Sequence, residues 1–263
     1  YGERHICRAC GVESTFHRMT DRRAFACAHC GDHIYPTAGT IFQDTRTPLQ
    51  VWFYAIYLFV TTRHGVSAKE LQRQLGVTYK TAWRMGHKIR EQMAKSDFTG
   101  MLGGHVEADE TYVGGRTKGK GQGYKGDKTI LVGMKERNGP VRAVVVDDVK
   151  QPTLRGVLTE NVERGSAVST DQFKSYGLLK GEGYEHGRVN HAENEWSRFD
   201  PKTGDTYSTN GIENFWKLFK YSVRSTHIHV SEQHMPSYVG EFTFRSNHRE
   251  QVYRMFDRLV AAF

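Results

Sequence analysis

Apolar residues are densest in one short run in the first quarter of the chain. The segment 51–60, VWFYAIYLFV, consists entirely of apolar and aromatic residues. Because Pro48 suits a first helical turn, the run predicts a helix over residues 48–62. A membrane-spanning helix needs about 20 such residues, so this shorter run predicts a buried helix inside a globular protein.

Two further helices are predicted after this run. Ser67 and Glu70 have the S-x-x-E spacing of a capping box, which starts a helix that continues to Leu75. Gly76 suits the following turn, and helical spacing of apolar residues predicts the next helix over 78–93. Its buried face comprises Ala82, Met85, Ile89 and Met93. Two short helices around a glycine-containing turn are typical of helix-turn-helix DNA readers, although helical hairpins without that function are also common.

Beyond residue 100 the pattern changes to short runs of the kind that form strands. Strands are predicted over 105–113, 129–135 and 141–149, followed by a helix over 153–162 and a strand over 167–171. This order predicts a mixed α/β sheet that opens with a three-stranded meander.

The distribution of charge adds a candidate partner. The 263 residues carry a net charge of +8, and residues 1–100 hold 14 Lys and Arg against 8 Asp and Glu. A basic first half favours nucleic acid as the partner, although a basic protein without such a partner would share this charge. Residues 116–128 (RTKGKGQGYKGDK) are rich in Gly and Lys, which suits either a solvated connector or a phosphate-binding loop.

The four cysteines form two close pairs. Two residues separate Cys7 from Cys10 and Cys27 from Cys30, and 16 residues lie between the pairs. This spacing is typical of structural zinc sites, in which each pair presents two thiolates to one tetrahedral Zn²⁺ at about 2.3 Å. We therefore expect one structural zinc ion. Two disulfides are the alternative, but no secretory signal is recognisable and we expect a reducing, intracellular compartment.

Three acidic residues stand where an acid is costly unless it binds a metal or a partner. Asp109 interrupts a predicted strand, with Glu107 on the same face, and Asp171 stands at the end of another strand. Glu213 lies one turn into a helix predicted over 210–220. Such acids can meet at one edge of a sheet, where they would hold two Mg²⁺ or Mn²⁺ ions about 3.5–4 Å apart for phosphodiester chemistry.

These acids also have ordinary structural interpretations. Glu213 follows Asn210 by three residues, so the two could form an N-cap with its reciprocal acid. Asp171 could be a turn residue. His186 and His191 could assist near the metals, although a lone histidine is more often structural.

Several longer motifs resemble one known family. They are YPTAGTIF (35–42), ADETYVGG (108–115), STDQFKSY (169–176), RFDPKTGDTYSTNGIENFWKLFK (198–220) and YVGEFTFRSNHR (238–249). In these motifs and in their order, the chain is similar over almost its whole length to the Merlin-like insertion-sequence transposases of bacteria. DETYVGG and TNGIENFW are the most specific of them.

The resemblance implies a ribonuclease-H-like catalytic domain with a DDE triad, carried over as Asp109, Asp171 and Glu213. Related enzymes can be read with an Asn as third member, which would point to Asn210. We favour Glu213 because a carboxylate binds Mg²⁺ better than an amide does. The resemblance also implies cut-and-paste movement between terminal inverted repeats, catalysed by a transposase multimer.

Together these observations predict an α/β fold with three domains. They are a zinc ribbon over 1–47, a helical helix-turn-helix DNA-binding domain over 48–100 and a ribonuclease-H-like DDE catalytic domain over 101–263. Candidates for base and phosphate contacts lie off the buried face of the second short helix: Lys80, Thr81 and Arg84.

We expect a DNA transposase that binds terminal inverted repeats of double-stranded DNA, cleaves at the element ends and joins them to target DNA. We expect it to act as a homo-oligomer on DNA, not at a membrane, in the bacterial cytoplasm at the nucleoid. Two other classes stay open. A domesticated DNA-binding protein would not nick inverted-repeat DNA with Mg²⁺, and a junction resolvase or nuclease on the same fold would not transfer strands.

Overall fold

The structure is a computed structural model that describes residues 4–114, 128–177 and 179–262. Its helices surround a mixed sheet, which confirms the predicted α/β class. Apart from Lys128, the Gly- and Lys-rich segment predicted over 116–128 lies outside the described residues.

The chain forms two compact units, and the first comprises residues 1–52. It holds a two-stranded and a three-stranded antiparallel sheet, with strands β1 (His5–Ile6), β2 (Glu13–Ser14), β3 (Phe16–Arg18), β4 (Phe25–Cys27) and β5 (His33–Ile34). The three-stranded sheet contributes to a small buried cluster of Cys7, Phe16 and Cys27. So few apolar side chains cannot hold such a segment folded by themselves.

Three helices follow, close to their predicted bounds: α1 (Leu49–Thr61), α2 (Ala68–Leu75) and α3 (Tyr79–Lys95). The side chain of Ser67 caps α2 by accepting the backbone N–H of Glu70 at 3.1 Å. Gly76 ends α2 in the left-handed conformation, with φ of 64°, which glycine adopts at little cost. Thr78 then caps α3, whose predicted apolar face is buried.

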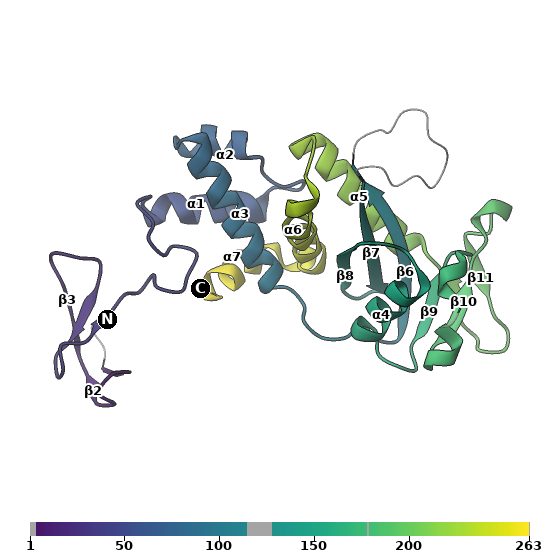
Figure 1. The fold of residues 1–263 in the computed structure, drawn as a ribbon, viewed down its shortest axis with the longest axis horizontal. Helices are drawn as coiled ribbons and strands as arrows, with labels where there is room; N and C mark the ends of the chain where they lie inside the picture. Colours follow the sequence, from purple (N-terminus) through teal and green to yellow (C-terminus); the bar gives the residue numbers. More distant parts are fainter. Residues whose placement is uncertain (1–3, 115–127, 178, 263) are drawn as a thin grey trace. The chain divides into compact units, whose positions relative to one another are not determined.

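The second unit, residues 53–262, is organised around a five-stranded sheet in the order β10-β9-β6-β7-β8 (Figure 1). Its strands are β6 (His105–Val113), β7 (Thr129–Glu136), β8 (Val141–Val146), β9 (Ala167–Thr170) and β10 (Glu185–Arg188). The first three form the predicted antiparallel meander, whereas β9 pairs in parallel with both β6 and β10. The predicted mixed sheet is therefore confirmed, and the architecture is consistent with a ribonuclease-H-like domain.

Helices cover both faces of this sheet. The α4 helix (Gln151–Asn161) buries Leu154 and Leu158 against one face, together with Val106 and Ala108 of β6. On the other face, α5 (Asn210–Ser222) and α6 (Met235–Asn247) share a core with Val113. Alternate residues of β6 thus face opposite layers, as the two-residue period of a strand requires.

The remaining elements are short. They are β11 (Ser197–Phe199), β12 (Thr206–Ser208), 3₁₀ turns at Lys174–Tyr176, Leu179–Glu182, His191–Glu193, Glu232–His234 and Arg249–Gln251, a π-helical turn at Val223–His227, and α7 (Val252–Ala261). Among the described residues, no helix combines the length and the apolar character needed to cross a membrane.

A buried ionic cluster of Arg90, Glu241 and Arg245 joins α3 to α6. The Nε of Arg90 donates to Glu241 at 2.6 Å, and Arg245 pairs with the second carboxylate oxygen. Arg90 also donates to the carbonyl of Val66, and Arg245 donates to that of Thr62. Each guanidinium therefore retains a backbone partner in addition to the shared carboxylate.

Candidate functional site

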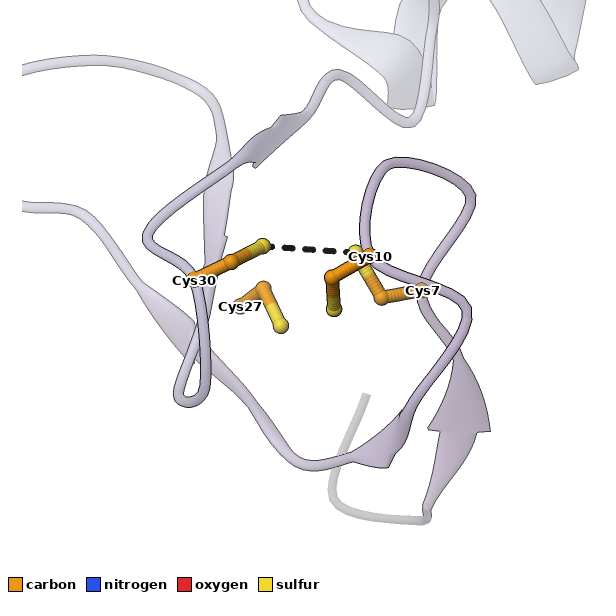
Figure 2. Close-up of side chains that lie close together, drawn as sticks. All are labelled: Cys7, Cys10, Cys27 and Cys30. Atoms are coloured by element: carbon orange, nitrogen blue, oxygen red, sulfur yellow. Dashed lines mark hydrogen bonds between the residues drawn. The ribbon is translucent and has the colours of Figure 1, made fainter.

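The two cysteine pairs meet in the first unit (Figure 2). All four side chains are free thiols, and their Sγ atoms lie within 4.8 Å of one another. The Sγ atoms of Cys7 and Cys30 are 3.7 Å apart. Tetrahedral Zn²⁺ with bonds of about 2.3 Å sets sulfur atoms about 3.8 Å apart, so the cluster fits one zinc ion.

The electrostatics of one of these cysteines also suit a metal ligand. Hydrogen bonds from the backbone N–H of Cys30 and from the Ser14 hydroxyl lower the pKa of Cys27 to about 6, whereas burial and the contacts with the other three thiols raise the pKa of Cys30 to about 12. A lowered thiol pKa favours the thiolate, which is the form that binds zinc.

The three predicted acids occupy neighbouring elements of the second unit. Asp109 lies near the middle of β6, and Asp171 directly follows β9. Because Glu107 of β6 stands opposite Ser169 in the parallel pairing, Asp171 comes level with Asp109. Glu213 lies in the first turn of α5, the helix that packs on β6.

A second acid of β6 fixes the start of α5. The buried carboxylate of Glu107 accepts the backbone N–H of Ile212 at 3.0 Å. Burial nevertheless raises the pKa of Glu107, against the lowering effect of the Ile212 and Gly211 amides. A carboxylate at a helix N-terminus also interacts favourably with the helix dipole. Glu107 thus holds the turn that carries Glu213 against the strand that carries Asp109.

The electrostatics of Asp109 reflect this crowding of acids. Burial, together with the charge of nearby carboxylates, raises the pKa of Asp109 to about 8. Those carboxylates belong to Glu110, Asp171 and Glu213, in decreasing order of effect. A half-buried acid among like charges is costly to ionise unless cations neutralise the cluster.

Glu213 has two side-chain partners, of which the sequence analysis named only His191, as a residue near the metals. Its Oε1 accepts the Thr209 hydroxyl at 2.6 Å and lies 2.8 Å from Nε2 of His191. The helix starts at Asn210 with Thr209 in the N-cap position, and no side chain caps the backbone there. The alternative of a capping box between Asn210 and Glu213 is therefore not seen.

The acids do not converge on a single point. Among the described residues, only the four cysteines bring three or more metal-ligand atoms within 4.8 Å of one another. The carboxylates are near enough to raise the pKa of Asp109, but they do not form a ready-made cage for one ion that all three would bind.

The predicted DNA-contact residues lie at the start of α3. Lys80 and Arg84 are exposed, whereas Thr81 is half-buried. The backbone N–H of Thr81 donates to the Thr78 hydroxyl at 3.3 Å, and the two hydroxyls are 3.0 Å apart. Lys80 and Arg84 are thus more accessible to a partner than Thr81 is.

Sequence reasoning missed two of the residues that support the acids, Tyr176 and Thr209. The Tyr176 hydroxyl, which is buried, donates to Glu110 at 2.9 Å on the α4 side of the sheet. Thr209 contacts Glu213 directly, whereas Glu107, which lies about 100 residues earlier in the chain, anchors the backbone of the same turn. The one available signal was Glu107, which shares a face with Asp109 in the two-residue period of β6.

A cysteine cluster that fits zinc and a mixed sheet that carries neighbouring acids define a zinc-ribbon protein with an α/β core. Residues 101–247 match the family model of the ISXO2-like transposase domain, and residues 1–33 match that of the transposase zinc-ribbon domain. The chain therefore belongs to this family of insertion-sequence transposases with an N-terminal zinc ribbon, which confirms the resemblance.

Two curated relatives agree. An "uncharacterized protein in transposable element ISH50" of Halobacterium salinarum is 24% identical over 258 residues, which cover 91% of this chain and 84% of the relative. An "uncharacterized transposase-like protein" of Haemophilus influenzae is 31% identical over 110 residues, 42% of this chain and 83% of the relative. A chain from the cryo-EM structure of the simian T-cell lymphotropic virus intasome in complex with PP2A regulatory subunit B56 gamma superposes with a TM-score of 0.31 at 12% identity. That match covers 64% of this chain and 63% of the other, and it is too loose to bear on the fold.

Proposed function

We propose that this chain is a DDE transposase, which cleaves DNA at the ends of an insertion sequence and joins them to target DNA. Its metal-binding acids would be Asp109, Asp171 and Glu213. The observation that carries the proposal is the half-buried Asp109, whose pKa other carboxylates raise, in a domain that belongs to a transposase family. Such a cluster of like charges destabilises a fold unless cations neutralise it.

The donor set fits Mg²⁺ or Mn²⁺, since the three side chains offer only carboxylate oxygens. Two such ions would activate water or a 3′-hydroxyl and stabilise the leaving oxygen of a phosphodiester. Because the acids do not gather round one point, Asp109, Asp171 and Glu213 would hold two ions rather than one.

The chain's own residues would set the position of the third acid. Thr209 and His191 contact Glu213 through one carboxylate oxygen, Oε1, which leaves Oε2 for a metal ion. Glu107 anchors the backbone of the same helical turn. The third acid would therefore be held in place before DNA or metal binds.

We propose a division of labour along the chain. The zinc ribbon (1–47) and the helical domain (48–100) would bind terminal inverted repeats, with Lys80 and Arg84 as contacts. Residues 101–263 would cut and join the DNA. The protein would work as a homo-oligomer that holds both element ends, in the bacterial cytoplasm at the nucleoid.

Cleavage of a duplex that spans one element end tests this proposal. The sequence of the duplex is taken from the inverted repeats that flank the coding region. Glu213→Gln keeps an oxygen that accepts the Thr209 hydroxyl but removes the charge that attracts Mg²⁺. Cleavage should fall by more than about 100-fold, since even partners of metal ligands are often worth 10–100-fold. Asp109→Asn should have the same effect, and Asn210→Ser should stay substantially active.

Binding and joining distinguish the remaining outcomes. Both acid variants should bind the duplex and, without metal, melt at no lower a temperature than the parent protein. Loss of activity in Asn210→Ser with retention in Glu213→Gln would move the third position to Asn210. A wild-type protein that binds but never cuts would be a DNA-binding relative without catalysis. One that cuts but does not join the end to a supercoiled plasmid would be a nuclease or resolvase.

A further inference from the structure

The turn that follows the π-helical end of α5 has a strained backbone at its tip. Ile228 has φ of 65° and ψ of −54°, and its N–H donates to the Val223 carbonyl at 2.8 Å. The N–H of His229 donates to the carbonyl of His227 at 2.7 Å, so these three residues close a γ-turn with positive φ at its centre. That form of the γ-turn is rare and strained, and a β-branched residue seldom adopts it.

Both sides of this turn are held in place. Val223 and Val230 are buried in the core that α5 shares with the sheet. The His227 ring packs edge-on against Tyr238 of α6, with 4.7 Å between the ring centroids. A strained residue persists only where its surroundings fix it, and such residues are concentrated at functional sites. The flanking contacts therefore present Ile228 at a fixed position.

The side chain at the tip is apolar and almost wholly in solvent. Ile228 is 86% exposed, the highest fraction among the large hydrophobic residues that the structure describes as exposed. Single exposed apolar residues are common on protein surfaces. Ile228 differs because its side chain gains no burial that would offset the strain of its backbone. This combination favours a partner that covers the side chain.

The turn lies beside a cavity at the end of β6. The cavity has a volume of about 380 Å³, and Val113, Ile228 and His229 contribute to its wall. None of the described residues that line it is acidic, whereas Lys220 and Arg224 are cationic. A hollow with this balance of charge attracts polyanions. The apolar tip thus stands where DNA would be the partner.

The distance from the acids to this turn can be counted along two elements. Val113 follows Asp109 by four residues on β6, which is about 13 Å at roughly 3.3 Å per residue. Val223 follows Glu213 by ten residues along α5 and its π-helical continuation, which is about 15 Å at 1.5 Å per residue. Val113 and Val223 share one core and line the same cavity, so the two estimates end at the same place. One DNA strand advances 3.4 Å per nucleotide, which places the turn about four nucleotides from a phosphate held at the acids.

We propose that Ile228 is a wedge that inserts between neighbouring base pairs of the bound element end, about four nucleotides from the cleaved bond. This rests on the proposed function. An apolar side chain that enters a base step unstacks it and kinks the duplex. The wedge would open the duplex beside the acids and so let the reacting strand approach them. It contacts the faces of bases, a role that a charged side chain could not fill.

The test follows base stacking with 2-aminopurine, a base analogue whose fluorescence rises when it is unstacked. The analogue is placed at each position within one helical turn of the cleaved bond, in a duplex that spans one element end. The protein carries Asp109→Asn, which prevents cleavage. Ile228→Leu keeps an apolar side chain, whereas Ile228→Gly removes it and relieves the strain, so a loss of signal in Ile228→Gly would not reflect unfolding. Tyr253→Ala is the control, because Tyr253 is a 73% exposed aromatic residue of α7.

Binding should raise the fluorescence most when the analogue lies about four nucleotides from the cleaved bond. Ile228→Leu should keep most of this increase and Ile228→Gly should lose most of it, whereas Tyr253→Ala should leave it unchanged. The proposal is overturned if no position shows an increase, if Ile228→Gly retains it, or if Tyr253→Ala loses it equally.

Cleavage by protein with an intact Asp109 provides a second readout. Ile228→Gly should cut the intact duplex about tenfold more slowly than the parent protein, because it must unstack the step without a wedge. A mismatch at the wedge position is already poorly stacked and should restore most of the rate. An undiminished rate on the intact duplex, or no rescue by the mismatch, would refute the wedge. A smaller oligomer in Ile228→Gly with unchanged fluorescence would mean that a second copy of the chain covers Ile228 instead.

The wedge and the proposed function fail separately. If the wild-type protein never cleaves but the fluorescence depends on Ile228, the proposed catalysis fails and the wedge stands. If it cleaves and no base is unstacked, the catalysis stands and the wedge fails.

Discussion

Replacing Glu241 with Gln should remove a large part of the stability of the second unit. The Glu241 carboxylate is buried between Arg90 and Arg245, whose charges lower its pKa to about 2 despite the opposing effect of burial. The ordinary value is 4.5. At about 1.4 kcal/mol for each tenfold change in acidity, this difference corresponds to roughly 3 kcal/mol. That agrees with the 3–5 kcal/mol typical of breaking a buried pair from one side.

The stabilisation has a definite dependence on pH. Folding depresses the pKa of Glu241, so the unfolded chain binds the proton more readily than the folded protein does. The contribution is therefore complete above about pH 4.5 and is lost as the pH falls toward about 2. Glu241→Gln should cost roughly 3 kcal/mol near neutral pH, and the difference from the parent protein should shrink as the solution is acidified.

Urea unfolding at several pH values measures this difference, with Glu70→Gln as the control. Glu70 pairs with Arg73 on the surface of α2, where the side chains are 37% and 75% exposed. An exposed pair contributes at most about 1 kcal/mol. If Glu241→Gln costs no more than Glu70→Gln, the ionic cluster does not stabilise the fold. If its cost is large but constant with pH, lost packing rather than the charge is responsible.

Three other changes have definite expected outcomes. Metal analysis of the protein purified under reducing conditions should find one Zn²⁺ per chain. Removal of the zinc by a chelator should unfold the zinc ribbon and weaken DNA binding without unfolding the catalytic domain. Two disulfides, or no zinc, would contradict this. Gly133→Ala should lower the free energy of unfolding by about 1–3 kcal/mol, because a Cβ there would clash with the Trp216 ring. Gly156→Ala, at an open position inside α4, should instead raise the free energy of unfolding by about 0.5–1 kcal/mol. Equal effects of the two substitutions in urea unfolding would disprove the clash. Ile228 has φ of 65° and its side chain is 86% exposed. Ile228→Gly should therefore raise the melting temperature, because it relieves roughly 1 kcal/mol of backbone strain. A lower melting temperature in the variant would refute this prediction.

The elements with strong local signals were predicted closely from the sequence. The strand predicted over 105–113 has those bounds, and the Ser67 cap and the Gly76 turn formed as expected. In each case the determining interactions lie within a few residues: alternation along a strand, a side chain that reaches the next turn, a glycine at positive φ. The strand predicted over 141–149 instead ends at Val146, because the Asp148 side chain accepts the backbone N–H of Lys150 and forms a turn.

Features that depend on distant pairing could not be predicted in the same way. Arg90 and Glu241 are 151 positions apart, and their sequence neighbourhoods read as ordinary helix. Charged residues are seldom buried, so local reasoning assigns both to the surface. The short strands β10, β11 and β12 were missed for a related reason. Each has at most four residues, and pairing partners rather than local propensity determine whether such segments become strands.

The structure bears on whether Glu213 caps a helix or binds a metal ion, which the sequence alone left open. The sequence allowed capping or metal binding, because an acid three residues after Asn210 suits both. In the structure Thr209 precedes the first residue of α5, so Glu213 is displaced from the capping position by one residue. Its carboxylate is instead held by Thr209 and His191, beside the strand of Asp109. An acid fixed in this way next to other carboxylates adds repulsion to the folded state, a cost that bound cations would remove. That is the physical reason to test Glu213 by charge removal, with the shape of the side chain retained.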